Sequence, residues 1–257
     1  MVLPIRPGTK KTMEKVPAGE YESIADSGLR DTRSSNFSLV SPVIRPPEQF
    51  LGPSHRPVYD FVAGVLSVLL ATLLLVALAP VFLGIALLIK LDSPGPVFFG
   101  QLRAARYGRP FVMFKFRTMV EDAEVRLHEV LDQNEEASGK LLRIPKDHRI
   151  TRVGQFLRKT SLDELPQLLN IIRGDMVFVG PRPPWYAEFL RYTPRESARL
   201  LITPGLTGLW QVSGRKDADF QTMVNLDLHY LLRRNLLFDL WIIIMTVPVI
   251  ILGRGAR

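Results

Sequence analysis

The chain has 257 residues, no cysteine and four histidines, none of which are spaced H-x-x-x-H. This composition excludes disulfides, thiolate metal sites, iron–sulfur clusters and a cysteine nucleophile, and it argues against a histidine metal site. The formal net charge of +8 favours an anionic partner, such as a nucleic acid, a phosphorylated substrate or an anionic lipid.

Residues 1–55 are rich in proline, serine and charged residues and have no sustained apolar period. Seven prolines, from Pro4 to Pro53, interrupt the segment. A chain of this composition buries too little apolar surface to offset the entropy cost of folding. The sequence therefore predicts a disordered cytosolic N-terminal tail over residues 1–55.

An uncharged run of 29 residues, Phe61–Ile89, lies between Asp60 and Lys90. One membrane span needs about 20 residues and two spans need about 40, so the run is long for one and short for two. Pro80 lies inside it, where proline bends a helix. Basic residues flank both ends, and such residues prefer the cytoplasm. We predict a re-entrant membrane helix over 56–90 that bends at Pro80 and returns to the same face, with an ordinary tilted span as the alternative.

A short apolar run, Val97–Phe99, and an alternating run, Phe111–Phe116, stand on either side of the turn signal Tyr107–Pro110. This pattern predicts a small β-hairpin or an extended pair. Basic side chains are frequent along the stretch. They suit either a lipid headgroup contact or a phosphate site that uses Lys115 and Arg117.

Helical spacing of apolar residues predicts an acidic amphipathic helix over 121–137. A second predicted helix runs from Leu162 to Ile172 and ends at Gly174. The uncharged C-terminal run Leu240–Leu252 would be about 20 Å long as a helix, which is too short to cross a bilayer. We predict that it lies in the membrane interface.

Two adjacent acids, Asp163 and Glu164, stand at the start of the predicted Leu162–Ile172 helix. Acidic side chains at a helix start accept hydrogen bonds from unpaired backbone N–H groups and interact well with the helix dipole. Ser161 and Glu164 fit a capping box, and Asp163 as N-cap places Pro166 in the first turn. Local structure can therefore account for both acids, and chemistry is the alternative.

Two loops carry candidate anion-binding groups. In Gly180–Pro183 the two prolines restrict the backbone around Arg182, and a rigid arginine suits bidentate recognition of phosphate. The Gly-rich stretch Thr203–Arg215 could present backbone N–H groups to an anion, although glycines at loose spacing are a weak signal.

Four motifs occur in order along the chain: KFRTM from Lys115, TSLDELPQLLN from Thr160, GDMVFVGPRP from Gly174 and PGLTGLWQVSGR from Pro204. On these motifs the chain resembles the bacterial sugar transferase family, the monotopic polyprenyl-phosphate phosphoglycosyl transferases of the hexose-1-phosphate type. The resemblance runs from about residue 56 to the C-terminus. Two positions depart from the family pattern: Ala79 stands where serine is frequent before the membrane proline, and Ala105 where glycine is frequent in a turn.

The resemblance implies an enzyme that transfers a sugar 1-phosphate from a UDP-sugar to polyprenyl (undecaprenyl) phosphate, with Mg²⁺, and releases UMP. Glucose or galactose is the expected sugar, and the reaction is the expected first membrane step of exopolysaccharide or other glycan synthesis. By match to the family's acidic dyad, Asp163 would be the nucleophile of a phospho-Asp intermediate, with Glu164 as its partner.

The resemblance also assigns the remaining site residues. Asp163, Glu164 and Asp227 would face Mg²⁺, and phosphate or nucleotide binding would fall to Lys115, Arg117, Arg158, Arg182 and Arg215. A carboxylate is already ionised at neutral pH, so it attacks phosphorus without a strong base, provided that cations shield the negative charge of the diphosphate.

The sequence thus predicts a mostly helical α+β fold for a monotopic membrane protein, with a re-entrant Pro-kinked helix, a small β-hairpin and interfacial amphipathic helices. A catalytic domain over 91–257 would lie on the cytosolic face of the bacterial inner membrane, with the C-terminal helix in the interface. The lipid bilayer is an expected partner, nucleic acid is not, and a homo-oligomer is left open. The alternative is a basic membrane-surface protein of a polysaccharide assembly complex that has no catalytic activity.

Overall fold

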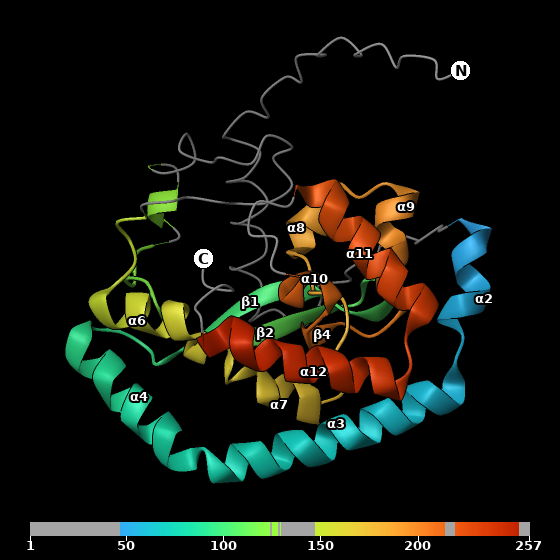
Figure 1. Cartoon of the computed structure of the whole chain (residues 1–257). Coiled ribbons are helices and arrows are strands. Elements are labelled where there is room, and N and C mark those ends of the chain that lie inside the picture. Colours follow the sequence, from blue (N-terminus) through green and yellow to red (C-terminus); the bar gives the residue numbers. More distant parts are fainter. Residues whose placement is uncertain (1–46, 124, 128, 130–146, 214–218, 252–257) are drawn as a thin grey trace, which may run out of the picture.

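The computed structural model describes residues 47–251 except 124, 128, 130–146 and 214–218. In this part the chain is mostly helical and has two small sheets of two strands each (Figure 1). The predicted mixture of many helices with a small hairpin is therefore confirmed. The predicted acidic helix over 121–137 falls largely outside the described residues; its described part contains the 3₁₀ turn η3 (Val125–Leu127).

The described chain begins with two short helical turns, η1 (Glu48–Phe50) and α2 (Leu51–Ser54). Phe50 is buried in the largest hydrophobic cluster of the molecule. Residues 48–54 are therefore ordered in the structure, although the sequence assigned them to the tail.

The apolar run forms two consecutive helices, α3 (Pro57–Ala77) and α4 (Ala79–Asp92). The break is at Leu78, whose φ of −92° and ψ of 4° are not helical, and Pro80 lies in the first turn of α4. Proline is tolerated there because its missing N–H has no helical partner in the first turn. In Figure 1, α3 runs along the lower edge of the molecule and α4 turns away from its direction. Within the described residues, α3 is the one helix long and apolar enough to cross a membrane.

Strands β1 (Phe98–Ala104) and β2 (Pro110–Phe116) form an antiparallel hairpin, with Phe98 opposite Phe116 and Ala104 opposite Pro110. The predicted hairpin is confirmed. Its connection contains the 3₁₀ turn η2 (Arg106–Gly108). Ala105 has a φ of −88°, which alanine adopts without strain, so the departure from the family's glycine is accommodated here.

The segment around the two acids is not one helix. The helix α6 (Arg152–Thr160) ends at Ser161, which has a left-handed φ of 57°. A 3₁₀ turn, η4 (Leu162–Glu164), follows, and α7 (Gln167–Ile172) begins after Pro166 as its N-cap. The predicted continuous helix over 162–172 is therefore wrong at its start, because Ser161 redirects the chain before the acids.

A parallel pair of short strands, β3 (Val177–Val179) and β4 (Gly205–Thr207), forms the second sheet. The backbones that follow them approach very closely. A Cβ atom at Gly205 would lie 2.0 Å from the amide nitrogen of Gly180, and one at Gly208 would lie 2.3 Å from the carbonyl oxygen of Gly180. Glycine is needed here for close packing, so these glycines need no ligand to explain them.

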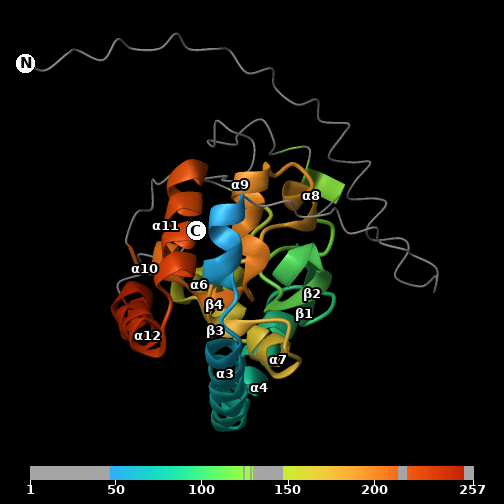
Figure 2. The same ribbon diagram turned by 90° about the vertical axis from the view of Figure 1, so that its right-hand side faces the viewer.

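The C-terminal half adds further helices around the small sheets. They are α8 (Tyr186–Phe189), α9 (Pro194–Ser197), η5 (Ala198–Leu201), α10 (Leu209–Val212), α11 (Phe220–Arg233) and α12 (Leu236–Ile251). Of these, α8 lies against β1, and α12 lies against β3 and β4. The buried face of α11 supplies much of the main hydrophobic cluster. Figure 2, which looks nearly along α3, shows α12 and α7 on opposite sides of α3. The predicted C-terminal helix is present.

Candidate active site

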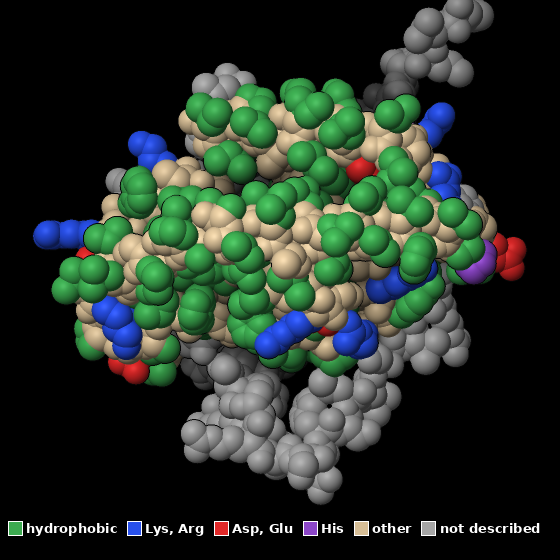
Figure 3. Space-filling view, turned by 90° about the horizontal axis from the view of Figure 1, so that it is seen from below, with side chains coloured by type: hydrophobic (Ala, Val, Ile, Leu, Met, Phe, Trp, Pro, Cys, Tyr) green, Lys and Arg blue, Asp and Glu red, His purple; other side chains and the backbone are tan. Residues whose placement is uncertain are grey.

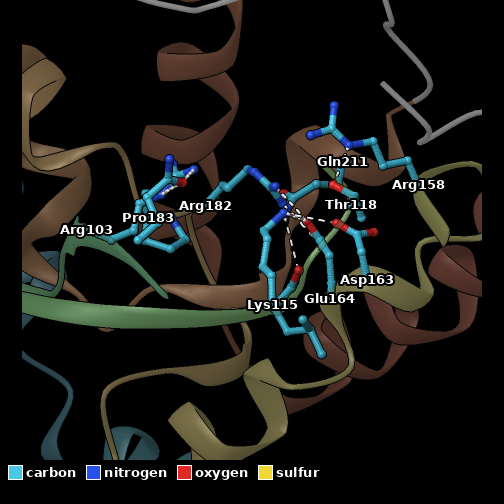
Figure 4. A network of polar contacts seen from close by, with 11 residues as sticks. Arg103, Lys115, Thr118, Arg158, Asp163, Glu164, Arg182, Pro183 and Gln211 are labelled. Atoms are coloured by element: carbon cyan, nitrogen blue, oxygen red, sulfur yellow. Dashed lines mark hydrogen bonds and ion pairs between the residues drawn. The ribbon is translucent and has the colours of Figure 1, made fainter. Parts of the chain in front are cut away.

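Asp163 and Glu164 lie at the centre of a network of charged side chains (Figure 4). Asp163 is only 7% exposed. Ser161 and both acids lie in the described part of the chain, and there the side chain of Ser161 makes no capping hydrogen bond. The capping role is therefore wrong for this dyad, since the helix after it begins at Pro166. The acids instead contact cations from other elements.

Lys115, near the end of β2, reaches both acids. Its Nζ atom lies 2.9 Å from Oε1 of Glu164 and 3.4 Å from Oδ2 of Asp163. Arg182, in the loop after β3, approaches Glu164 as well: its Nη2 donates to Oε1 at 2.6 Å and its Nη1 lies 3.5 Å from Oε2. Three segments that are distant in sequence therefore meet at one pair of carboxylates.

The two carboxyl groups have different electrostatic environments. Burial alone would raise the pKa of Glu164, but the charges of Arg182 and Lys115 hold that pKa well below its usual range. Burial raises the pKa of Asp163 above its usual range, although the charge of Lys115 opposes the shift. Glu164 is thus firmly ionised, while Asp163 is the more weakly compensated and more basic of the two.

Arg158, from α6, approaches from the Asp163 side (Figure 4). Its Nε donates to Oγ1 of Thr118 at 2.9 Å, which orients the guanidinium. Burial lowers the pKa of Arg158, and the charge of Asp163 partly offsets this effect. The position of Arg158 is fixed because α6, which carries it, packs directly against the chain after β2. The contact is so close that a Cβ atom at Gly154 would lie 2.0 Å from the carbonyl oxygen of Thr118.

Arg103, which no motif in the sequence singled out, supports the Arg182 loop. It is buried on β1, donates from Nη1 to the carbonyl oxygen of Pro183 at 2.9 Å, and also donates to the side chain of Gln101. Its guanidinium lies over the ring of Trp185, 5.6 Å from the centroid. Burial lowers the pKa of Arg103 to about 9. The available signal was the alternation on β1, which puts Gln101 and Arg103 on one face.

Three predicted site residues do not join the network as described. Arg117 donates from Nη2 to the backbone and side-chain oxygens of Ser93, so it ties the end of α4 to the hairpin. Asp227 forms a buried ion pair with Arg199. Arg215 lies outside the described residues.

The carboxylates of the site fit Mg²⁺ that is bound together with a phosphorylated substrate. In the described part of the chain, no three His, Cys, Asp or Glu residues form a group that could hold a metal ion. Mg²⁺ in phosphoryl-transfer enzymes is commonly bound by one or two carboxylates together with substrate phosphates and waters. Asp163 and Glu164 supply such a pair of carboxylates, so these residues suit a metal that arrives with a diphosphate.

Comparison with known proteins identifies the family. The model of the bacterial sugar transferase family matches residues 58–253. The exopolysaccharide production protein ExoY of Sinorhizobium fredii is 43% identical over 204 residues, covering 78% of this chain and 90% of that protein. The UDP-glucose:undecaprenyl-phosphate glucose-1-phosphate transferase of Caulobacter vibrioides is 41% identical, covering 77% of this chain and 72% of that protein.

Some relatives are much longer than this chain. The undecaprenyl-phosphate galactose phosphotransferase of Salmonella typhimurium is 38% identical over 199 residues, which is 76% of this chain but 42% of that protein. The similarity to such relatives therefore concerns the part that they share with this chain.

Proposed function

Because this chain belongs to the bacterial sugar transferase family, we propose that it is a phosphoglycosyl transferase that moves a sugar 1-phosphate from a UDP-sugar to polyprenyl (undecaprenyl) phosphate and releases UMP. Relatives named for glucose 1-phosphate and for galactose support a hexose donor, and relatives named for exopolysaccharide production support a role in that synthesis. The observation that carries the proposal is the buried Asp163–Glu164 pair held between Lys115 and Arg182.

The proposed chemistry has two displacement steps at one phosphorus atom. In the first, a carboxylate oxygen of Asp163 bonds to the phosphorus that bears the sugar, and the bond from that phosphorus to the bridging oxygen of UMP breaks. UMP leaves with the electron pair. In the second, a phosphate oxygen of the polyprenyl phosphate bonds to the same phosphorus, and the carboxylate of Asp163 is released. Asp163 suits the nucleophile role because its raised pKa makes it the more basic of the pair.

The surrounding cations neutralise charge in this scheme. Lys115, Arg158 and Arg182 converge on the acids from three elements, so they can bind the diphosphate oxygens and the departing phosphate. Glu164 orients Lys115 and Arg182 and, together with Asp163, would hold Mg²⁺. When bound, Mg²⁺ would supply electrostatic stabilisation of the charge on the transferred group. Arg215, beyond the described residues, remains a proposed phosphate ligand.

The attachment of α3 and α4 supports the proposal that they are a monotopic, re-entrant membrane element. At the start of α3, Asp60 pairs with Arg234. At the end of α4, the carboxylate of Asp92 accepts a hydrogen bond from the backbone N–H of Val153 at 3.0 Å. Both ends of the broken helix are therefore fastened to the same domain, whereas a helix that crosses the bilayer would separate its ends by about 30 Å of hydrocarbon.

The exposed apolar side chains supply the proposed membrane-facing surface. Seen from below, they gather along α3 and α4 and continue on α12, with basic side chains at the edges (Figure 3). On α12 the exposed residues include Leu237, Leu240, Trp241, Ile244 and Ile251. A continuous apolar face of this size on a chain with basic flanks suits a lipid interface. We assign the catalytic domain to the cytosolic side of the bacterial inner membrane, where a soluble nucleotide sugar meets a lipid phosphate.

The same reasoning gives the proposed domain division: an N-terminal segment over 1–55, whose first 46 residues lie outside the described part and whose Phe50 packs into the main hydrophobic cluster, a membrane element over 56–90 and a catalytic domain over 91–257. Whether copies of the chain associate is left to experiment.

The test is UMP release by the detergent-purified protein with Mg²⁺ and undecaprenyl phosphate across a panel of UDP-sugars. We expect release with one hexose donor, and we expect Asp163→Asn to abolish it while thermal unfolding stays unchanged. Without acceptor, intact-mass spectrometry should find the wild type heavier by one hexose phosphate and the Asp163→Asn variant unmodified. Robust release by the Asn variant would exclude Asp163 as the nucleophile.

The alternative is a basic membrane-surface protein without catalytic activity. It predicts vesicle binding by wild type and Asp163→Asn alike, and no UMP release by either protein with any donor. The opposite pKa shifts of two adjacent acids, Asp163 raised by burial and Glu164 lowered by Arg182 and Lys115, disfavour this alternative, because strongly shifted pKa values concentrate at functional sites.

A further inference from the structure

Asp227 lies on α11, away from any solvent. Its side chain and that of Arg199 are 2% and 1% exposed, and Nη2 of Arg199 lies 2.5 Å from Oδ2 of Asp227. Unlike Glu164, whose side chain is 20% exposed, Asp227 is closed off from solvent by its pair with Arg199, so a hydrated divalent cation does not reach its carboxylate. A direct metal role for Asp227 therefore needs the pair to break, at a cost that only a strong ligand interaction could offset.

Arg199 connects Asp227 to the active site. The same Nη2 atom that faces Asp227 also donates to the backbone carbonyl oxygen of Arg182 at 2.9 Å. Its Nη1 donates to the hydroxyl of Tyr192 at 3.3 Å. The guanidinium of Arg199 thus contacts Asp227, Tyr192 and the backbone of Arg182. Arg182 is the residue whose own guanidinium contacts Glu164.

The Arg182 loop is held from two sides. Arg199 binds the carbonyl oxygen of Arg182, and Arg103 binds that of Pro183 at 2.9 Å. Proline on each side of Arg182 limits the backbone rotations that remain. Because the loop is fixed through two carbonyl groups, the guanidinium of Arg182 is presented to Glu164 without a search through many conformers.

From this geometry we infer that Asp227 is a positioning residue that acts through Arg199 on the backbone of Arg182, and that it does not bind the metal. The inference rests on the proposed function, because Arg182 matters here as a group that contacts Glu164 and the donor diphosphate. It replaces the sequence-based assignment of Asp227 to the metal set.

The first test is metal binding without turnover. Mn²⁺ is titrated into metal-free protein at a UDP concentration that saturates every variant, and free Mn²⁺ is followed by electron paramagnetic resonance. We expect Asp227→Asn to leave the Mn²⁺ dissociation constant within about twofold of wild type, and Glu164→Gln to weaken it about tenfold or more. Weakening by Asp227→Asn to the same extent as Glu164→Gln would overturn the inference.

The second test is a double-mutant cycle on UDP binding, measured by calorimetry with Mg²⁺. Asp227→Asn, Arg199→Lys and Arg182→Ala should each weaken UDP binding about tenfold, and the double variant Asp227→Asn with Arg182→Ala should be no weaker than Arg182→Ala alone. Additive losses would show that Asp227 acts independently of Arg182 and would overturn the positioning role.

Glu196→Gln is the matched control. Glu196 is also a buried acid of this region, and it accepts hydrogen bonds from the backbone N–H of Thr193 at 2.8 Å and from Gln221 at 2.9 Å. This variant should lower the free energy of unfolding. In UDP binding, the effects of Glu196→Gln and Arg182→Ala should simply add, with no coupling between the two sites. Neither binding measurement requires catalysis. Absence of UMP release by the wild type would therefore count against the proposed function, while the Mn²⁺ titration would still decide whether Asp227 is a ligand.

Discussion

The guanidinium of Arg182 lies 2.6 Å, from Nη2 to Oε1, from the carboxylate of Glu164, although 18 residues separate them in the chain. The contact joins the loop after β3 to the 3₁₀ turn that carries both acids. Arginine presents parallel N–H groups that match a carboxylate, so this contact sets orientation as well as charge. A lysine would keep the charge and lose the orientation.

The first prediction concerns that difference. Arg182→Lys should lower kcat/KM for the UDP-sugar by about 10–100-fold, which corresponds to about 1.4–2.7 kcal/mol of transition-state stabilisation. Arg109→Lys is the control, because Arg109 is exposed and its ion pair with Asp175 joins the hairpin turn to the segment before β3. Steady-state UMP release measures both variants. Equal activity of Arg182→Lys and wild type would show that charge alone suffices.

The second prediction concerns pH. Burial raises the pKa of Asp163 and the charge of Lys115 opposes this shift, so Lys115→Met should let the pKa rise further. A nucleophilic carboxylate must be ionised, and the acidic limb of the kcat/KM profile should therefore move to higher pH in Lys115→Met. Lys115→Arg keeps the positive charge and should leave the limb near its wild-type position. An unmoved limb in Lys115→Met would mean that the limb does not report Asp163.

The third prediction concerns the packing that places Arg158. A Cβ atom at Gly154 would lie 2.0 Å from the carbonyl oxygen of Thr118, so Gly154→Ala must push α6 away from the chain after β2. We expect a loss of about 2–4 kcal/mol in the free energy of unfolding, together with lower activity, because Arg158 moves with α6.

Gly64→Ala is the matched control for this change. A Cβ atom at Gly64, also in a helix, would have no atom within 4 Å, and alanine favours helix over glycine. Denaturant unfolding in detergent compares the two variants. Similar stabilities for both would contradict the close contact between α6 and Thr118.

The fourth prediction concerns stability and pH. Burial raises the pKa of Glu188 to about 7, even though the charges of Arg103, Arg199 and Arg182 oppose the shift. Since its folded-state pKa exceeds its unfolded value of 4.5, the group takes up a proton on folding between these values. Its contribution is therefore fully present below about pH 4.5 and is lost as the pH rises through about 7. Glu188→Gln should remove that part of the slope.

The measurement is the free energy of unfolding of wild type and Glu188→Gln at several pH values from 5 to 8. From pH 5 to pH 8, we expect the free energy of unfolding of the variant to rise relative to that of the wild type by on the order of 1 kcal/mol. The difference between the two proteins matters here, because other carboxyl groups titrate in both. A difference that does not change with pH would show that Glu188 does not take up a proton on folding.

The fifth prediction concerns α12. Trp241 is 46% exposed on the proposed membrane-facing surface, so brominated phospholipid should quench its fluorescence in reconstituted vesicles. The emission of Trp241 is obtained as the difference between wild type and Trp241→Phe. The difference for Trp185→Phe is the control, because Trp185 lies beside Arg103 at the active-site loop. Equal quenching of both tryptophans would argue against an interfacial α12.

The sequence predicted those structural elements that neighbouring residues alone determine. The hairpin followed from alternation and turn residues at Tyr107–Pro110, and the β1–β2 pairing confirms it. The apolar run and Pro80 predicted a helix that bends at that proline, and the structure interrupts the helix two residues earlier, at Leu78. The membership in the bacterial sugar transferase family, expected from four ordered motifs, is also confirmed.

The errors came from contacts between distant segments. Arg117 is two residues from Lys115, and such residues share a face only while the strand continues, but β2 ends at Phe116 and Arg117 turns to Ser93. The acids looked like a cap because capping is a local rule, whereas Lys115 and Arg182 decide their role.

The pattern of buried residues on α11 carries a further signal about Asp227. On α11, Asp227 shares the stripe of buried apolar residues that includes Val224, Leu228 and Leu231. An acid on the buried face of a helix needs a buried cation as partner. This pattern favours an ion pair at Asp227 over the metal role that the resemblance assigned to it, although it does not identify Arg199 as the partner.

The contacts at the start of α3 also determine when, during synthesis, this helix can be fastened to the rest of the domain. The hydroxyl of Tyr59 donates to the carboxylate of Asp239 at 2.6 Å, and Asp60 pairs with Arg234, so partners about 180 residues apart close the two ends of the domain on each other. The apolar helices leave the ribosome long before residues 230–239 exist. Until then Asp60 can pair with Arg106, 3.3 Å away in the structure, but not with Arg234, so the proposed membrane element is fastened at this end only after α11 and α12 have been made.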